Sequence, residues 1–238
     1  RDYIELETPM LQMIHGGAAA RPFVTHMNAL DTDLYLRIAT EIYLKRAVVG
    51  GVDRVFEMNR NFRNEGMDSS HSPEFTSLEA YEAYSDYNGM AELTRDLIQQ
   101  AARDAFDLSE GEEIVRLADG TEYDLSGQWD RIDLYGSTSE ALGEEITVET
   151  PRETLVKYAE RIGLEVDDYA VSGKIVEDIF EELVASKLWA PTFVYDFPED
   201  TSPLTRYHRS RPGLTEKWDL YVRGFETGTA YSELADPV

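Results

Sequence analysis

The stretch Phe62-Arg63-Asn64-Glu65, followed by a polar loop and by His71-Ser72-Pro73-Glu74-Phe75, decides the fold of this chain. Residues 54–65 carry apolar and aromatic side chains that suit a pleated, half-buried strand. Residues 66–73 contain the Gly, Ser and Asp typical of a turn, and residues 74–84 again read as a strand. The sequence therefore predicts two paired strands joined by a polar loop.

One surface of this strand pair has the side chains of a binding site. Because side chains alternate along a strand, Arg63 and Glu65 point the same way, while Phe75, Glu79 and Tyr81 share one face of the return strand. Taken alone, each is more typical of a core or a solvated face. Together, a cation, an aromatic ring, a carboxylate and a phenol suit a nucleotide and a cationic small molecule.

The composition limits the class of protein. With 238 residues, 42% of them hydrophobic, the chain can form one large domain or two small ones. A net charge of −25 argues against a general polyanion-binding surface, although a local basic patch remains open. The lack of cysteine excludes disulfides and thiolate metal sites. No secretory signal and no membrane-spanning apolar run are visible, which predicts a soluble cytoplasmic protein.

Both ends of the chain look interrupted. It opens inside an alternating strand at residues 1–7 and stops at Pro237-Val238 without a closing element. We therefore expect it to be part of a longer protein, whose function is the one to identify.

The first part of the chain contains two further helix patterns. A strand over residues 33–39 precedes a helix with Thr40 as N-cap that ends at Gly50-Gly51. Residues 88–106 predict an amphipathic helix. Its expected buried stripe is Met90, Leu93, Leu97, Ala101 and Ala105.

Residues 109–190 predict an insert between core segments 1–108 and 191–238. It opens with a hairpin that turns at Asp119-Gly120. A capping box at Thr150-Pro151-Arg152-Glu153 starts one helix, and a second starts near Ser172. The second helix is expected to bury Ile175, Ile179, Leu183 and Val184, and an apolar strand over 192–197 follows.

Residues 217–234 predict a hairpin with Arg223-Gly224 at its tip. Asp219 and Glu226 would lie diagonally on one face, within reach of a shared cation, although two exposed carboxylates are the plainer interpretation. Mg²⁺ prefers such oxygen ligands. Glu233 lies seven residues beyond Glu226 and so would face the other way, unless a bulge at Gly228 redirects it.

Histidine and glycine patterns add one candidate each. None of the four histidines has metal-ligand spacing; His71 is a candidate phosphate contact, and the other three are interpreted as structural or exposed. The run Gly16-Gly17-Ala18 is either a flexible turn or a place where backbone approaches a ligand. It matches neither a GxGxxG nor a Walker sequence.

Several segments resemble the lysyl-tRNA synthetases, a family of class II aminoacyl-tRNA synthetases, over nearly the whole chain. Phe56 to Glu65 resembles motif two, and Pro9 resembles the signature proline of motif one. The runs Glu74 to Tyr81 and Tyr231-Ser232-Glu233-Leu234 favour lysine. Further similar segments are Gly16 to Phe23, Tyr35 to Glu41 and Val48 to Gly51.

The resemblance implies a role for each candidate residue. Arg63 would clamp the lysine carboxylate against the ATP α-phosphate. ATP would also contact Glu65 through its adenine amino group, Phe75 by stacking and His71 through its β- and γ-phosphates. Asp219 and Glu226 would hold Mg²⁺. Lysine would be bound by Gly17, Glu41, Glu79, Tyr81, Tyr231 and Glu233.

The resemblance also implies the fold and the reaction. The fold would be α+β, an antiparallel sheet flanked by helices. The parent, a homodimer active in protein biosynthesis, would form lysyl-adenylate from L-lysine and ATP and pass lysine to tRNA(Lys). Asp219 and Thr229 depart from the Glu and Asn common in the family. Because motif three, most of motif one and the anticodon-binding barrel are missing, we expect this chain alone to be inactive.

Two alternatives stay open from the sequence. A synthetase paralogue could activate lysine for a protein or lipid acceptor with an identical pocket. A synthetase-derived module could also act in binding alone, without catalysis.

Overall fold

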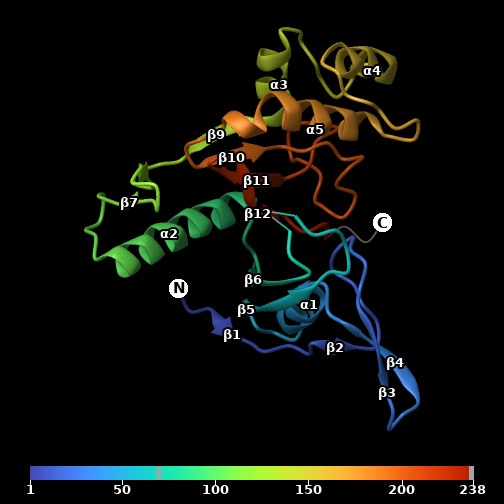
Figure 1. Cartoon of the computed structure of the whole chain (residues 1–238), viewed down its shortest axis with the longest axis vertical. Helices are drawn as coiled ribbons and strands as arrows, with labels where there is room; N and C mark the ends of the chain where they lie inside the picture. The colour runs from blue at the N-terminus through green and yellow to red at the C-terminus, as the bar shows by residue number, and fades with distance from the viewer. Residues whose placement is uncertain (69–70, 236–238) are drawn as a thin grey trace. The chain divides into compact units, whose positions relative to one another are not determined.

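The computed structural model describes residues 1–68 and 71–235. The chain separates into two compact units, unit 1 over Arg1–Tyr84 and unit 2 over Ser85–Val238 (Figure 1). The predicted ending at Pro237-Val238, and Ser69-Ser70 of the predicted polar loop, lie outside the described residues.

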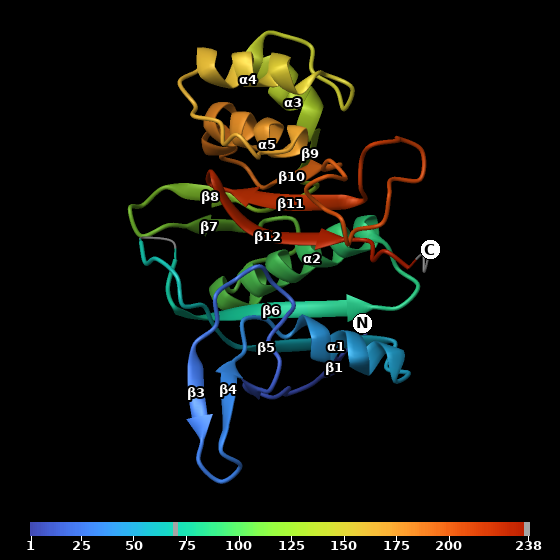
Figure 2. The ribbon, with the colours of Figure 1, turned by 90° about the vertical axis from the view of Figure 1, so that its right-hand side faces the viewer.

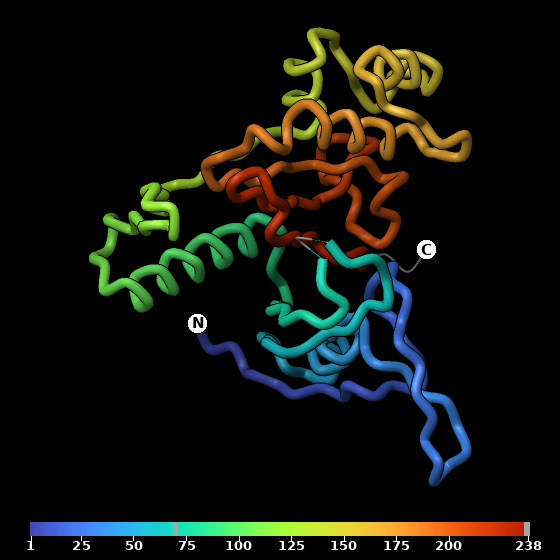
Figure 3. Tube along the Cα trace, in the orientation of Figure 1, coloured from blue at the N-terminus to red at the C-terminus, as the bar shows by residue number. Residues whose placement is uncertain are grey.

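Unit 1 contains two small sheets and one helix. In the first sheet, β1 (Ile4–Glu5) runs parallel to β5 (Arg54–Phe62), and β5 pairs with β6 (Glu74–Glu82) in antiparallel fashion. The predicted strand pair is therefore confirmed. The second sheet has the order β2-β4-β3 and is antiparallel, with β2 over Leu11–Gln12, β3 over Val24–Met27 and β4 over Thr32–Leu36. Figure 3 traces the projecting β3–β4 hairpin.

Helix α1 (Glu41–Val49) packs against β5 and β6 (Figure 2). It begins after Thr40 and ends at Gly50, as predicted, but the Thr40 side chain makes no capping hydrogen bond. The covered side of the strands is largely polar, because Glu57 and Asn61 are buried beside Val55. On the other side Met58 is 60% exposed. The alternation is that of a half-buried strand, with the polar face inward.

Unit 2 is built around a four-stranded sheet with the order β12-β11-β10-β9. Its strands are β9 (Asp130–Asp133), β10 (Thr192–Tyr195), β11 (Lys217–Val222) and β12 (Phe225–Tyr231). Its helices are α2 (Tyr87–Phe106), α3 (Leu134–Leu142), α4 (Arg152–Arg161), α5 (Ser172–Leu183) and the 3₁₀ turn η1 (Ala185–Lys187). A separate hairpin pairs β7 (Ile114–Arg116) with β8 (Glu122–Asp124).

The sheet of unit 2 has a core on each face. Val194 and Tyr221 face the helical side, where α5 buries Ile175 and Ile179. The alternate strand residues form the other core with α2 and the β7–β8 hairpin; they are Phe193, Tyr195, Trp218 and Leu220. Figure 2 shows the resulting layers, with α3, α4 and α5 on one side of the sheet and α2 on the other.

The predicted α+β class is confirmed, but the antiparallel sheet is corrected to mixed sheets. Strand β1 is parallel to β5, and β9 is parallel to β10. A parallel pair needs a long crossover, and helices α3 to α5 supply one between β9 and β10. Strand composition alone does not reveal such a pairing.

Two local predictions were wrong in detail. Helix α4 begins at Arg152, with Pro151 at the cap in an extended conformation, and Thr150 Oγ1 accepts instead from the Thr147 N–H at 2.8 Å. A turn therefore uses the hydroxyl expected in a capping box. Helix α2 exists as predicted, but it buries Ala91 and Ala102, while Leu97 is 46% exposed.

The segments expected in the predicted insert are all present. The hairpin turns at Asp119-Gly120, and α5 begins at Ser172. Strand β9, which lies in the same range, joins the sheet of β10 to β12. The boundaries at 109 and 190 stay a prediction.

Trp218 offers a test of the core of unit 2. Its side chain is 1% exposed, donates Nε1–H to the Tyr87 carbonyl at 2.7 Å and packs on Phe193. We expect Trp218→Phe to lower the free energy of unfolding by about 2 kcal/mol through the lost hydrogen bond and apolar area. Trp189→Phe, at a half-exposed tryptophan, should cost less than about 1 kcal/mol. Equal shifts in denaturant midpoint would contradict this account.

Candidate functional site

The first group of candidate residues lies on the covered face of β5 and β6 in unit 1. The register pairs Asn61 with Phe75 and Glu57 with Glu79, so these side chains share a face with Tyr81. The guanidinium of Arg63 lies 5.1 Å from the ring centroid of Phe75. The predicted cation, ring, carboxylate and phenol are therefore on one side of the strand pair.

Glu79 lies at the centre of a small polar cluster. Its Oε1 accepts from the Thr40 backbone N–H at 3.2 Å, and its Oε2 accepts from the Tyr81 hydroxyl at 3.2 Å. Next to it, Lys45 Nζ pairs with Glu41 Oε1 at 2.9 Å and lies 5.9 Å from the Tyr81 ring centroid. The Lys45 ammonium therefore pairs with the Glu41 carboxylate within helix α1, and binding of a lysine substrate here stays a prediction.

Gly17 lies against Glu41, as the grouping of these two residues predicts. Gly17 has φ +90°, and a Cβ placed there would be 3.0 Å from the Cβ of Glu41 and 3.2 Å from that of Ala39. A side chain at position 17 would thus be both strained and crowded. The Gly17 backbone therefore lies close to the Cβ atoms of Glu41 and Ala39.

Glu65 and His71 lie in the connection between β5 and β6. Glu65 is exposed, and its Oε1 accepts from the Arg21 backbone N–H at 3.1 Å. The side chain of His71 is 74% exposed, and its Nδ1 lies 2.9 Å from Asp68 Oδ2. Their roles toward ATP stay predictions.

The second group lies on the β11–β12 hairpin of unit 2. The tip at Arg223-Gly224 is as predicted, and Tyr221 pairs with Glu226. The register shifts between Leu220 and Tyr221, which leaves Thr227 as the extra residue of a bulge next to Gly228.

The bulge changes which side chains share a face. Beyond it, Thr229 pairs with Asp219 and Tyr231 with Lys217. Glu226, Thr229 and Tyr231 therefore all point to the side of Asp219, although a regular strand would turn Glu226 away from the other two. The bulge is thus where the sequence predicted it.

Asp219 and Glu226 line one cavity of about 500 Å³ beneath α5. Asp219 Oδ2 accepts from Lys217 Nζ at 3.1 Å, whereas its buried Oδ1 has no hydrogen-bond partner among the described residues. Burial, together with the charge of nearby Asp219, raises the pKa of Glu226 to about 7. Two crowded carboxylates, one with a bare oxygen, fit a hard cation.

The pair does not form a metal site on protein ligands alone. Within residues 1–68 and 71–235, no group of three or more His, Cys, Asp or Glu side chains is suited to hold a metal ion. Mg²⁺ normally keeps several waters and often takes phosphate oxygens as well. Binding of Mg²⁺ by Asp219 and Glu226, with further ligands from a nucleotide, therefore stays a prediction.

The segment that contains Tyr231 and Glu233 is fixed by the loop between β10 and β11, which Figure 3 traces. Glu233 forms a β-bridge with Thr205, and the Ser232 N–H donates to the Glu216 carbonyl at 2.9 Å. Ser232 Oγ accepts from the Tyr87 N–H at 3.1 Å. The segment is thereby held from both sides within unit 2.

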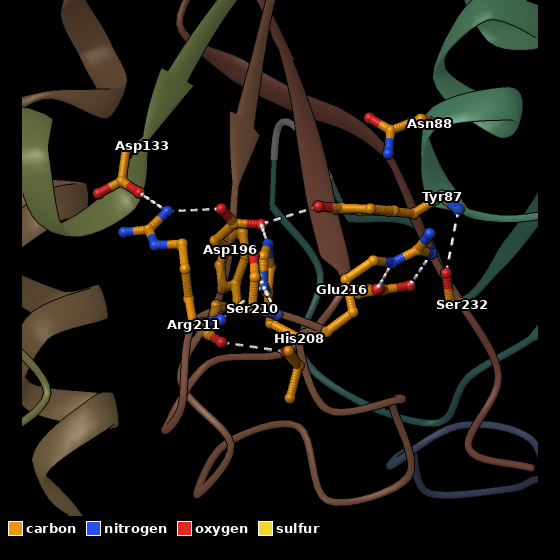
Figure 4. Close-up of polar contacts among 12 residues, drawn as sticks. Tyr87, Asn88, Asp133, Asp196, His208, Ser210, Arg211, Glu216 and Ser232 are labelled. Carbon is orange, nitrogen blue, oxygen red and sulfur yellow. Dashed lines mark hydrogen bonds and ion pairs between the residues drawn. The ribbon is translucent and has the colours of Figure 1, made fainter.

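A partly buried polar network supports this loop (Figure 4). Arg211 Nη1 bridges Asp133 and Asp196 at 2.5 and 2.6 Å, and the Tyr87 hydroxyl donates to Asp196 at 3.2 Å. His208 Nδ1 accepts from the backbone N–H groups of Ser210 and Arg211, in keeping with its structural interpretation. Asp196 and Arg211 were not predicted, because no local sequence pattern marks them.

Sequence comparisons with known proteins identify the family of this chain. A sequence model of the family described as tRNA synthetases class II (D, K and N) matches residues 1–238. The chain belongs to this family. Its relatives include lysine–tRNA ligases of Kineococcus radiotolerans, 62% identical, and Mycobacterium bovis, 55% identical; each match covers the whole chain, but only 47% and 48% of the relative. The predicted resemblance to lysyl-tRNA synthetases is therefore confirmed.

Another relative of this class II chain has a different name. The lysylphosphatidylglycerol biosynthesis bifunctional protein LysX of Mycolicibacterium vanbaalenii is 52% identical over the whole chain, which spans 22% of that protein. The chain spans about half the length of the lysine–tRNA ligases that it matches. In its described residues, every helix is too short or too polar to cross a membrane.

The loop of this class II chain also has a pH-dependent contact. Glu216 is fully buried and accepts from Arg209 Nε at 2.5 Å and Nη2 at 3.0 Å. The hydrogen bond from Arg209, which outweighs burial, holds the pKa of Glu216 below its usual value of 4.5. The stabilisation is therefore present above pH 4.5 and is lost as the pH falls through the lower, folded-state pKa.

We expect Glu216→Gln to lower the free energy of unfolding by about 1–2 kcal/mol at pH 7, because Arg209 loses a charged acceptor. The difference from wild type should shrink in acid, as measured by denaturant unfolding at several pH values. Glu182→Gln, at an exposed carboxylate of α5, is the control and should change little. A constant difference from pH 7 to pH 3 would contradict the argument.

Proposed function

We propose that the full-length protein containing this chain is a lysine–tRNA ligase, which activates L-lysine with ATP and transfers it to tRNA(Lys). The observation that carries this proposal is the face of unit 1 on which Arg63 lies over Phe75 while Glu79 and Tyr81 form a hydrogen-bonded pair. The family match and the names of the lysine–tRNA ligase relatives support it. The protein is inferred to be cytoplasmic and homodimeric.

Unit 1 residues account for the first chemical step. Arg63 has a planar, permanently charged guanidinium that can bridge the lysine carboxylate and the ATP α-phosphate. In this first step, the lysine carboxylate would attack the α-phosphorus of ATP in line, which gives lysyl-adenylate and pyrophosphate. No protein nucleophile is needed, since positioning and charge neutralisation lower the barrier. Phe75 would stack on the adenine, while Glu65 and His71 contact its amino group and the phosphates.

The proposed lysine contacts follow from charge. The ε-ammonium of lysine needs an anionic partner when it leaves water. Glu79 would supply the negative charge, and the Tyr81 hydroxyl would supply a neutral acceptor oxygen. Gly17 and Glu41 would take the α-amino group. The roles of Tyr231 and Glu233, which belong to unit 2, stay predictions from the resemblance.

Asp219 and Glu226 would hold Mg²⁺. When bound, the ion neutralises phosphate charge. The side chain of Asp219 is shorter than the Glu common at this position, and Thr229 lacks the amide of the common Asn. Both departures fall on the cavity of unit 2.

The acceptor is a separate question. The LysX relative favours a second candidate, a protein that activates lysine for a lipid. Charging of tRNA(Lys) and of lipid vesicles with radiolabelled lysine by the full-length protein separates these candidates. A third candidate, a non-catalytic binding module, requires that lysine-dependent ATP–pyrophosphate exchange be absent.

The clamp role is tested by Arg63→Ala in the full-length protein. Pyrophosphate exchange should fall to background, because no other group of this strand face can bridge two anions. Arg60→Ala is a matched control, since Arg60 pairs with Thr76 on the opposite face and its side chain is 54% exposed. Exchange by the Arg63 variant within a few-fold of wild type would remove Arg63 from the mechanism.

Substrate choice tests the lysine pocket. Wild type should activate lysine and reject norleucine, which is similar in length but uncharged, by roughly 10⁴-fold in kcat/KM. Glu79→Gln should raise the KM for lysine more than the KM for ATP. Glu74→Gln is the control, because Glu74 lies on the other face of β6 and its side chain is 58% exposed. Equal activation of lysine and norleucine would show that the pocket assignment is wrong.

A further inference from the structure

Unit 1 encloses an ion pair for which the proposed reaction has no direct use. The side chains of Arg37 and Glu57 are 0% and 1% exposed, and Arg37 Nη1 lies 2.8 Å from Glu57 Oε1. The guanidinium also donates from Nε to the Arg60 carbonyl at 2.8 Å and from Nη1 to the Thr8 carbonyl at 2.9 Å. One side chain thus joins three segments of the unit.

Glu57 completes the cluster from the other side. It accepts from the Thr8 hydroxyl at 2.6 Å and from the Thr8 and Asn59 nitrogens at 3.2 Å. Burial alone would raise the pKa of Glu57, but the bonds from Thr8 and Arg37 hold it below its usual value. Thr8 between β1 and β2, Arg37 directly after β4, and strand β5 are therefore fixed to one another by charged hydrogen bonds.

The segment that follows Arg37 contacts both Arg63 and Glu79, the side chains proposed to bind substrate. The Arg37 carbonyl accepts from the Phe62 N–H at 2.9 Å, and the Ile38 carbonyl accepts from Arg63 Nε at 3.3 Å. Two residues later, the Thr40 N–H donates to Glu79 at 3.2 Å. Residues 37–40 thus hold the clamp residue at one end and the ammonium partner at the other.

Stability alone is a weak reason for such a pair. Desolvating two charges costs several kcal/mol each, and well-packed apolar residues often stabilise a fold equally well. What an apolar side chain cannot do is fix the orientation of a neighbouring backbone segment through several directed hydrogen bonds. Arg37 reaches three acceptors at once through Nε and Nη1, while its buried Nη2 has no hydrogen-bond partner among the described residues. The single ammonium of lysine does not reproduce two donor nitrogens held in one plane.

We propose that Arg37, together with Glu57, is a positioning residue that fixes residues 37–40 so that Arg63 and Glu79 are held ready for the lysine substrate. The inference rests on the proposed function. Arg37 and Glu57 would not touch the substrate. They would control the geometry of the activation step through the residues that do.

The test is Arg37→Lys in the full-length protein, assayed by lysine-dependent pyrophosphate exchange. The variant keeps a cation beside Glu57 but loses the fork. We expect kcat to fall about 100-fold, the size of effect that a misplacement near 1 Å produces, while the KM for ATP stays within about threefold. Far-UV circular dichroism and the thermal midpoint establish that the variant folds.

The control makes the same Arg-to-Lys substitution in another ion pair of the same strand pair. Arg54 Nε lies 2.7 Å from Glu82 Oε1 at the end of β5 remote from Arg63. Arg54→Lys should leave kcat within about threefold of wild type. If Arg54→Lys and Arg37→Lys lower kcat equally, or if folded Arg37→Lys keeps kcat within threefold, the proposal is overturned.

Two milder variants, both at Thr8, test the positioning role even if Arg37→Lys fails to fold. Thr8→Val keeps the shape of the side chain but removes the hydroxyl from Glu57 and Arg37, and should lower kcat about tenfold. Thr8→Ser retains the hydroxyl and should restore kcat to within twofold of wild type. Equal kcat for both would refute the positioning role. Absence of lysine-dependent exchange in wild type would instead refute the proposed function.

Discussion

A strand face that buries polar side chains must supply each of them with a hydrogen-bond partner. The arrangement of side chains around β5 and β6 in unit 1 follows from this constraint. Strands β5 and β6 turn Glu57 and Asn61 inward, while the apolar Met58 is exposed. Asn61 Nδ2 donates to Ser77 Oγ across the pair at 2.6 Å, and Glu57 is satisfied by Arg37 and Thr8. The same inward face carries Phe75, Glu79 and Tyr81. Polar burial therefore provides the surface on which ligand chemistry is possible.

The parts of the fold that the sequence predicted depend on neighbouring residues. Alternation between residues 54 and 65 gave the strand pair, and Gly50-Gly51 gave the end of α1. The tip at Arg223-Gly224 fixed the β11–β12 register near the turn. Such signals act over a few residues, so they survive without knowledge of the tertiary structure. The grouping of Phe75, Glu79 and Tyr81 was predictable for the same reason.

The parts that the sequence missed depend on distant partners. Arg37 lies in an apolar run, and only the fold shows that Thr8 and Glu57 meet it. The buried side of α2 is decided by the sheet that covers it, which is why Leu97 is exposed in spite of its position on an apolar stripe. Thr150 could cap a helix, but a turn with Thr147 uses its hydroxyl. In each case, two arrangements satisfied the local pattern and a long-range contact selected one.

Backbone groups carry much of the precision in unit 1. Arg63 is held by the Ile38 carbonyl and Glu79 by the Thr40 N–H, and neither contact depends on the identity of the side chain at 38 or 40. A main-chain group moves only with its segment. The positions of Arg63 and Glu79 therefore depend on how firmly residues 37–40 are held in place. That attachment is the side chain of Arg37, which binds carbonyl oxygens of residues 8 and 60 on either side of it. The orientation of the partly buried Arg63 and Glu79 side chains is therefore determined in the buried layer beneath them.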